Sequence, residues 1–242
     1  MDILFDIVIP VGPNDSQVIE KMIEHTTKNI IGYRNIYLVS YDPTIKFNNC
    51  ITVDETIFPF NKNTISNYLG NNDRLGWYLQ QLIKLYSGLV IKDILNNYLV
   101  IDSDTYFLKF TTFFKNKLPL YNTGTEYHIP YFEHMNKLHP SLTKQTNHSG
   151  ICHHMMFQTN IIVELFKLVE NYHHESFYIS FLKCINSKDI LGSGASEYEI
   201  YFNYLHIYHK NKFIIRELKW ENTNFLTINK KLDYISYHWY MR

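Results

Sequence analysis

The amino-acid sequence predicts a single α/β domain with a mostly parallel central sheet flanked by helices. Short apolar runs rich in β-branched residues alternate with longer stretches of helical periodicity, an order typical of βαβ units. No internal repeat, low-complexity tract or linker divides the 242 residues. A chain of this length buries a sizeable core without help from disulfides or a structural metal.

Each expected element follows from an apolar pattern and from the residues that end it. Residues 7–11 form the first expected strand, which prolines and a glycine terminate. Residues 14–16, Asn-Asp-Ser, are N-cap candidates for a helix over 17–29. The further strands are expected at 36–40, 51–53 and 98–101, and the further helices at 75–90, 160–172 and 197–209.

Charge and cysteine content exclude several classes of protein. Lys+Arg and Asp+Glu both count 23, whereas a protein that grips nucleic-acid phosphates needs a cationic excess. The three cysteines show no CxxC spacing and indicate reduced thiols rather than a disulfide framework or a zinc cluster. No apolar run is long enough to span a bilayer, and Asp2 and Asp6 argue against a signal peptide. We expect a cytoplasmic protein of undetermined oligomeric state, with neither nucleic acid nor membrane as partner.

An acidic loop, Asp102-Ser103-Asp104, directly follows the expected strand 98–101. In open parallel sheets, ligands lie beyond the carboxyl ends of the strands. Two carboxylates there suit a hard cation such as Mg²⁺ or Mn²⁺, which prefers oxygen ligands and could bridge to the oxygens of a diphosphate. The alternative is a solvated turn, since Asp and Ser both favour turns.

Residues 101–105 resemble the metal-binding Asp-x-Asp motif of nucleotide-sugar-dependent glycosyltransferases with the GT-A fold. Residues 7–11 are similar to the first strand of that fold, whose end meets the nucleotide. Four more segments resemble, in the same order, a poorly characterised GT-A-like family of bacteria and large DNA viruses: 74–84, 152–155, 196–204 and 237–239. The resemblance therefore covers nearly the whole chain.

The resemblance implies a metal-dependent transferase of the hexosyl or N-acetylhexosaminyl type. Residues 1–105 would form the nucleotide-binding half and residues 106–242 the acceptor-side half. The donor would be a nucleotide sugar, with UDP expected on family grounds, and the acceptor a hydroxyl group of a glycan or another molecule. Mn²⁺ or Mg²⁺ would be held by Asp104 and His238, while Asp102 would contact the ribose or reach the metal through water. The implied nucleotide and donor contacts are Pro10, Val11, Arg74, Trp77, Gln80, Gln81, Lys84, Asp102 and Ser103.

Several of these residues also have a structural interpretation. Gln80 and Lys84 share a helix face at i, i+4, and this could be a solvated face with Trp77 as a core anchor. His153 and His154 point to opposite sides if they lie on a strand, so we do not expect them to share a metal. The resemblance implies that one of them lines the acceptor or the donor sugar. His238 could equally be packed between aromatic neighbours in a docked tail.

Glu197 is the candidate general base. Ser196 and Glu199 fit a Ser-x-x-Glu capping box, which leaves Glu197 at the first helical position. The resemblance to inverting GT-A enzymes implies a base at this place, which takes the proton from the acceptor hydroxyl. A helix N-terminus lowers the basicity of a carboxylate, and burial would offset that effect.

Three alternatives stay open at this point. A retaining transferase would share the fold and the metal site but would not need Glu197 as a base. A nucleotidyltransferase would be expected to carry a Gly-rich, basic loop near the N-terminus, and residues 11–15 are neither. A non-catalytic, lectin-like or scaffold protein would bind a sugar or nucleotide without turnover.

Overall fold

The computed structural model describes residues 3–224 and 231–237. Its centre is a five-stranded sheet in the order β10-β5-β1-β3-β4. The strands β1, β3, β4 and β5 are parallel, and β10 runs antiparallel to β5 at one edge. Their bounds are β1 Phe5–Val11, β3 Tyr33–Ser40, β4 Cys50–Asp54, β5 Asn97–Ile101 and β10 His154–Gln158.

The register of the sheet places the candidate site at the carboxyl ends of its parallel strands. Ile7 of β1 pairs with Ile36 of β3 on one side and with Leu99 of β5 on the other. The carboxyl ends of these three strands therefore meet at the same edge. Both β1 and the last four residues of β5 are buried, as expected for strands that are covered on both faces.

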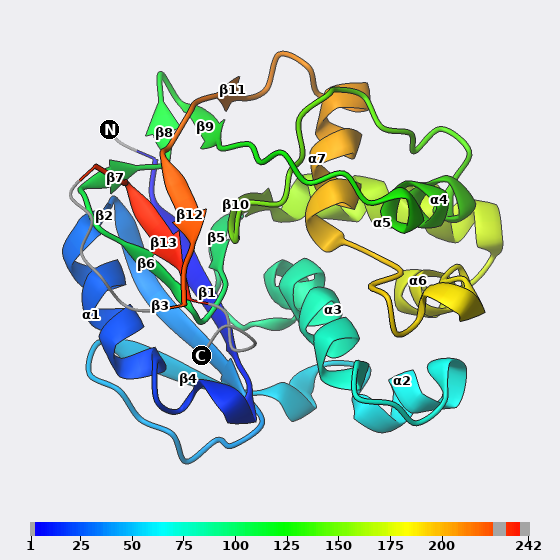
Figure 1. The fold of residues 1–242 in the computed structure, drawn as a ribbon, viewed down its shortest axis with the longest axis horizontal. Coiled ribbons are helices and arrows are strands. Elements are labelled where there is room, and N and C mark those ends of the chain that lie inside the picture. Colours follow the sequence, from blue (N-terminus) through cyan, green and yellow to red (C-terminus); the bar gives the residue numbers. More distant parts are fainter. Residues whose placement is uncertain (1–2, 225–230, 238–242) are drawn as a thin grey trace.

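Helices cover both faces of the sheet (Figure 1). The helix α1 (Ile19–Asn29) lies on one side and packs against β6 (Thr105–Phe107), whereas the other helices gather on the opposite side. Of these, α3 (Leu75–Val90) packs on β1, β5 and β10. The other helices are α2 (Lys62–Leu69), α4 (Ile129–Leu138), α5 (Thr159–His173), α6 (Phe177–Lys183) and α7 (Glu197–Tyr208).

A second, three-stranded sheet brings the end of the chain back to the acidic loop. Its order is β12 (Trp220–Asn222), β13 (Tyr234–Ser236) and β6. Ser236 pairs with Thr105, the residue that follows Asp104. The described part of the tail is thus docked. The remaining strands are β2 (Ile30–Ile31), β7 (Thr111–Thr112), β8 (Phe114–Lys115), β9 (Leu118–Tyr121) and β11 (Ile214–Ile215).

The structure confirms an α/β fold with a mostly parallel central sheet. Each strand and helix expected from the sequence is present, and α3 has the expected bounds. The expected cap of α1 is wrong. Residues 13–15 form a short 3₁₀ turn in which Asp15 accepts a hydrogen bond from the Gly12 amide, so α1 begins later and its N-cap is Val18. In the described parts of the chain, no helix is both long and apolar enough to cross a membrane.

Candidate functional site

A buried lysine joins two carboxylates at the carboxyl edge of the sheet. Lys84 of α3 places its Nζ 2.5 Å from Oδ1 of Asp102 and 2.7 Å from Oε1 of Glu197. Asp102 directly follows β5, and Glu197 is the first residue of α7. The lysine side chain is only 3% exposed. One ammonium group therefore connects α3 and the end of β5 with the start of α7, which is 113 residues from Lys84 in the sequence.

Asp102 has partners on both of its oxygens. The Tyr198 hydroxyl donates to Oδ1 at 2.9 Å, the same oxygen that Lys84 contacts. Nδ1 of His153 lies 3.3 Å from Oδ2. The backbone amide of Asp102 also donates to the His153 carbonyl at 2.9 Å. His153 has a left-handed backbone with φ 64°, and the ring stands edge-on to Trp220. This set of contacts fixes the orientation of the Asp102 carboxylate.

The two carboxylates differ in basicity. Burial alone would raise the pKa of Asp102, but the Lys84 ammonium and the hydrogen bond to His153 hold it well below the usual range. Burial raises the pKa of Glu197, and the contact with Lys84 only partly opposes this effect. Burial would also lower the pKa of Lys84, yet the two carboxylates raise it above its ordinary value. Glu197 is thus the more basic carboxylate, beside a permanently charged lysine.

Asp104 lies on the other side of the acidic loop, against the C-terminal tail. Its backbone carbonyl accepts a hydrogen bond from the Tyr237 amide at 2.8 Å. Oδ1 accepts one from the Ser236 hydroxyl at 3.3 Å. The side chain is largely buried. The expected third metal ligand, His238, lies outside the described residues.

The side chains at this site can be compared with the ligands that a divalent cation requires. Residues 3–224 and 231–237 contain no group of three His, Cys, Asp or Glu side chains placed to hold a metal. Magnesium, however, is commonly bound by one or two carboxylates together with substrate phosphates. The ammonium at Asp102 would repel a cation there, so Asp104 is the better candidate of the two.

One face of α3 runs along residues 193–197, the segment that leads into α7. The contacts along this face follow the chain in order. Arg74 Nη2 donates to Ser193 Oγ at 2.5 Å, and the Tyr78 hydroxyl accepts a hydrogen bond from the Gly194 amide at 3.1 Å. Further along, Gln81 Oε1 accepts a hydrogen bond from the Glu197 amide at 3.1 Å, and Lys84 bonds to the Glu197 carboxylate. The expected donor-binding residues of this helix are therefore engaged with the start of α7. A phosphate contact from Lys84 would have to replace one of its two ion pairs.

The other expected donor-binding residues surround this centre. Pro10 and Val11 are buried at the carboxyl end of β1 and pair with β3. Ser103 is buried within the acidic loop. Trp77 is partly exposed, and its ring lies 4.2 Å from the Arg74 guanidinium carbon. Gln80 is also partly exposed on α3.

The two adjacent histidines have different surroundings. His153 contacts Asp102, whereas His154 is packed edge-on against Phe107, Phe113 and Tyr234. Both ring nitrogens of His154 are buried without a hydrogen-bond partner among the described residues. Burial, helped by the charges of Arg216 and His153, lowers the pKa of His154 to about 3. Of the pair, His153 is therefore the one next to the candidate site.

The capping prediction at α7 is confirmed in its first part. Ser196 Oγ accepts a hydrogen bond from the Glu199 amide at 3.3 Å. The Glu199 carboxylate accepts hydrogen bonds from Ser149 at 2.5 Å and from Asn203 at 2.8 Å, so it holds the loop that contains Ser149 against α7.

Sequence reasoning missed Tyr198 as a residue of the site, although its hydroxyl donates a hydrogen bond to Asp102. The feature of the sequence that could have identified Tyr198 is its position directly after Glu197 at the start of the helix.

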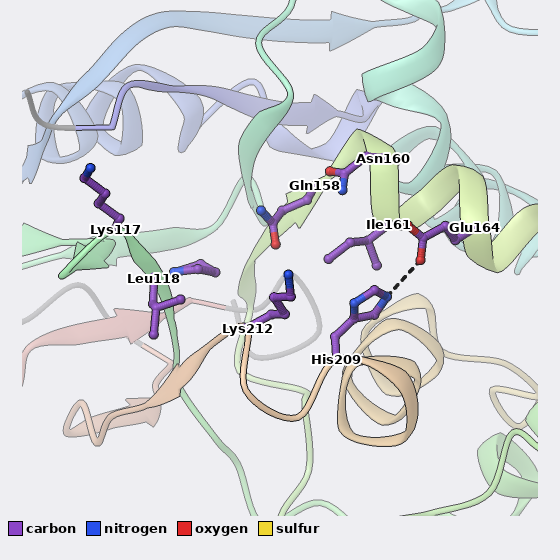
Figure 2. Close-up of a pocket in the computed structure, with 9 residues that line it drawn as sticks. Lys117, Leu118, Gln158, Asn160, Ile161, Glu164, His209 and Lys212 are labelled. Atoms are coloured by element: carbon purple, nitrogen blue, oxygen red, sulfur yellow. Dashed lines mark ion pairs between the residues drawn. The ribbon is translucent and has the colours of Figure 1, made fainter.

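A cavity of about 260 Å³ lies away from this site (Figure 2). Its wall includes Gln158, which pairs with Asn97 at the opposite end of β5 from Asp102. His209 and Glu164 form an ion pair of 3.0 Å at its edge. None of the residues expected to act on a donor or acceptor lines this cavity.

A comparison with protein-family models gives no match to this chain. No curated protein is significantly similar to it.

Proposed function

We propose that the protein is a GT-A-like, metal-dependent glycosyltransferase that moves a sugar from a nucleotide diphosphate donor, UDP being the expected one, to a hydroxyl acceptor with inversion. The observation that carries the proposal is the meeting of Asp102 and Glu197 at one ammonium group, beyond the carboxyl end of β5. The edge where they meet is where parallel sheets bind ligands. The Asp-x-Asp loop and the candidate base are thus brought to one place.

The proposed roles follow from these contacts. Asp104 would hold Mn²⁺ or Mg²⁺ together with diphosphate oxygens, and the cation would neutralise charge on the leaving nucleotide. Lys84, Tyr198 and His153 orient Asp102 toward the donor. Pro10 and Val11 end β1 at the same edge and are suited to contact the nucleotide.

Glu197 is proposed to take the proton of the acceptor hydroxyl. Burial raises the pKa of this carboxylate toward the range of a general base. The Lys84 ammonium, 2.7 Å away, fixes its orientation and opposes part of the effect of burial on its pKa. The side chain is buried, which limits competition from bulk water.

A thermal-shift screen of nucleotide sugars, with and without Mn²⁺, tests this proposal. We expect the melting temperature to rise with one nucleotide class and only when the metal is present, because a ligand that binds the folded state stabilises it. Glu24→Ala, which removes an exposed carboxylate on α1, should keep this response. Equal shifts with and without metal would contradict the proposal.

A retaining transferase of the same fold is the second candidate. The observation that favours it is the ion pair at Glu197, since a carboxylate held by an ammonium is a weaker base than a free one in the same site. Proton NMR of the anomeric configuration in the product separates the two mechanisms.

A further inference from the structure

Arg74 carries a guanidinium group that has no carboxylate partner among residues 3–224 and 231–237. It lies over the ring of Trp77 and donates one hydrogen bond, to the neutral hydroxyl of Ser193. Its Nε is buried and has no partner among the described residues. Arg34 of the same chain, by contrast, contacts both oxygens of Asp6. The charge of Arg74 is therefore available to a ligand in a way that the charge of Arg34 is not.

A second unused donor lies on the same face of α3. Gln81 is 1% exposed, and its Oε1 accepts a hydrogen bond from the Glu197 amide. The Nε2 of this side chain is buried and has no partner among the described residues. Buried amide groups are rarely left unpaired, because the loss of hydration is costly. Arg74 and Gln81 are two helical turns apart, and both contact the segment 193–197.

Both donors are close to the candidate base. Gln81 accepts a hydrogen bond from the amide of Glu197 itself, and Arg74 contacts Ser193, four residues before Glu197. The Arg74 side chain therefore lies beside the segment that leads into α7. A sugar bound at Glu197 would have this strip of donors beside it.

We propose that this strip, Arg74 with Gln81 and the ring of Trp77, binds the carboxylate of an acidic sugar, so that the substrate is a hexuronate. The inference rests on the proposed function and names a substrate class for the same site. The planar guanidinium fork matches the two oxygens of a carboxylate. One positive charge with one neutral amide suits a single negative charge better than a phosphate dianion. The Arg74 guanidinium already covers one face of the Trp77 ring, and the partly exposed remainder of the ring is proposed to contact the C–H groups of the sugar.

The first arm of the test asks whether the carboxylate belongs to the donor. Calorimetry with Mn²⁺ would compare UDP-glucuronate and UDP-glucose, which differ only at C6 of the sugar. We expect the uronate to bind about 10- to 100-fold more tightly, the range for a hydrogen bond to a charged group. The preference should disappear in Arg74→Gln. It should persist in Lys62→Gln, which removes an exposed charge near the start of α3.

The second arm asks whether the carboxylate belongs to the acceptor. With UDP and Mn²⁺ present, methyl β-glucuronide is compared with methyl β-glucoside in the same variants. A uronate preference that Arg74→Gln abolishes, in either arm, supports the inference and identifies which substrate is acidic. No preference in either arm, or a preference that survives Arg74→Gln, would overturn it.

Two controls keep the result interpretable. Arg74→Lys retains a charge and a donor for Ser193 but not the fork, so we expect a smaller preference than in the wild type. If Arg74→Gln does not fold, the comparison of the wild type with Arg74→Lys decides. If UDP itself fails to bind with Mn²⁺, the proposed function fails, and the glycoside arm without nucleotide then decides the inference alone.

Discussion

Lys84 and Asp102 form an ion pair of 2.5 Å between α3 and the end of β5. The lysine is buried, and its second partner, Glu197, is buried as well. Charges removed from water need partners, because an isolated ion in the interior is strongly destabilising. The three charges therefore depend on one another, and each can be tested by removing one member.

Lys84→Met should destabilise the protein strongly. The substitution leaves the buried Glu197 and the partly exposed Asp102 near each other without a cation, and removing one partner of a buried ion pair costs about 3–5 kcal/mol. The free energy of unfolding in urea measures this loss. Lys183→Met, which breaks an exposed ion pair with Glu175, should change stability little. Similar effects of the two substitutions would contradict the structural role of Lys84.

Glu197→Gln should separate binding from transfer. The amide keeps the shape of the side chain and an oxygen that can accept a hydrogen bond from Lys84, but it cannot take a proton. We expect donor affinity to be retained and the rate of transfer to fall by about 10²- to 10⁴-fold. Product formation and calorimetry measure the two quantities, with the exposed Glu221→Gln as control. Unchanged transfer would remove Glu197 as the base.

His154 should make stability depend on pH. Burial lowers its pKa from 6.5 to about 3, so between these values only the unfolded chain binds the proton. The contribution of His154 is complete above pH 6.5 and is lost as the pH falls through this window, at up to about 1.4 kcal/mol per pH unit. His154→Leu should flatten the profile, whereas the exposed His148→Leu should not. His134, whose pKa burial lowers to about 4, adds a slope of the same sign in both variants.

Two glycines should respond to alanine in opposite directions. At Gly150, an added Cβ would lie 2.5 Å from Cβ of Phe202 and 2.9 Å from the Tyr198 carbonyl of α7. Gly150→Ala should therefore cost about 1–3 kcal/mol by overpacking. At Gly76 of α3 the nearest atom is Cε of Lys62, 4.0 Å away, so Gly76→Ala should stabilise by about 0.5–1 kcal/mol. Thermal unfolding of the two variants checks the signs, and a stabilising Gly150→Ala would contradict the packing of α7.

The local pattern of apolar residues was enough to predict the parallel strands of the central sheet and the longer helices that cover it. The apolar residues of α3 repeat at helical spacing over four turns, and residues 98–101 of β5 are an uninterrupted apolar run, so neighbouring residues alone determine both. The strand β10 was not predicted, because it follows a long irregular stretch and only its pairing with β5 identifies it. The short helices α2 and α6 were also missed, since seven or eight residues contain too few repeats of the pattern.

Individual residues of the candidate site were singled out from the sequence, but the contacts between them were not predicted. Asp102 and Glu197 were singled out from their positions after a strand and before a helix. Lys84 was expected at a phosphate, because nothing local indicates that a residue 113 positions later supplies a carboxylate for it. Tyr198 was missed for the same reason, as its partner Asp102 is 96 positions away.

The central claim is that the Asp104 carboxylate seats a cation to which a nucleotide diphosphate binds, and calorimetric titration of UDP in the presence and absence of Mn²⁺ tests it most directly. The proposal predicts binding that requires Mn²⁺ and that Asp104→Ala abolishes, while Glu24→Ala binds as the wild type does. Binding of UDP that is equally tight without the metal, or that persists in Asp104→Ala, would contradict it.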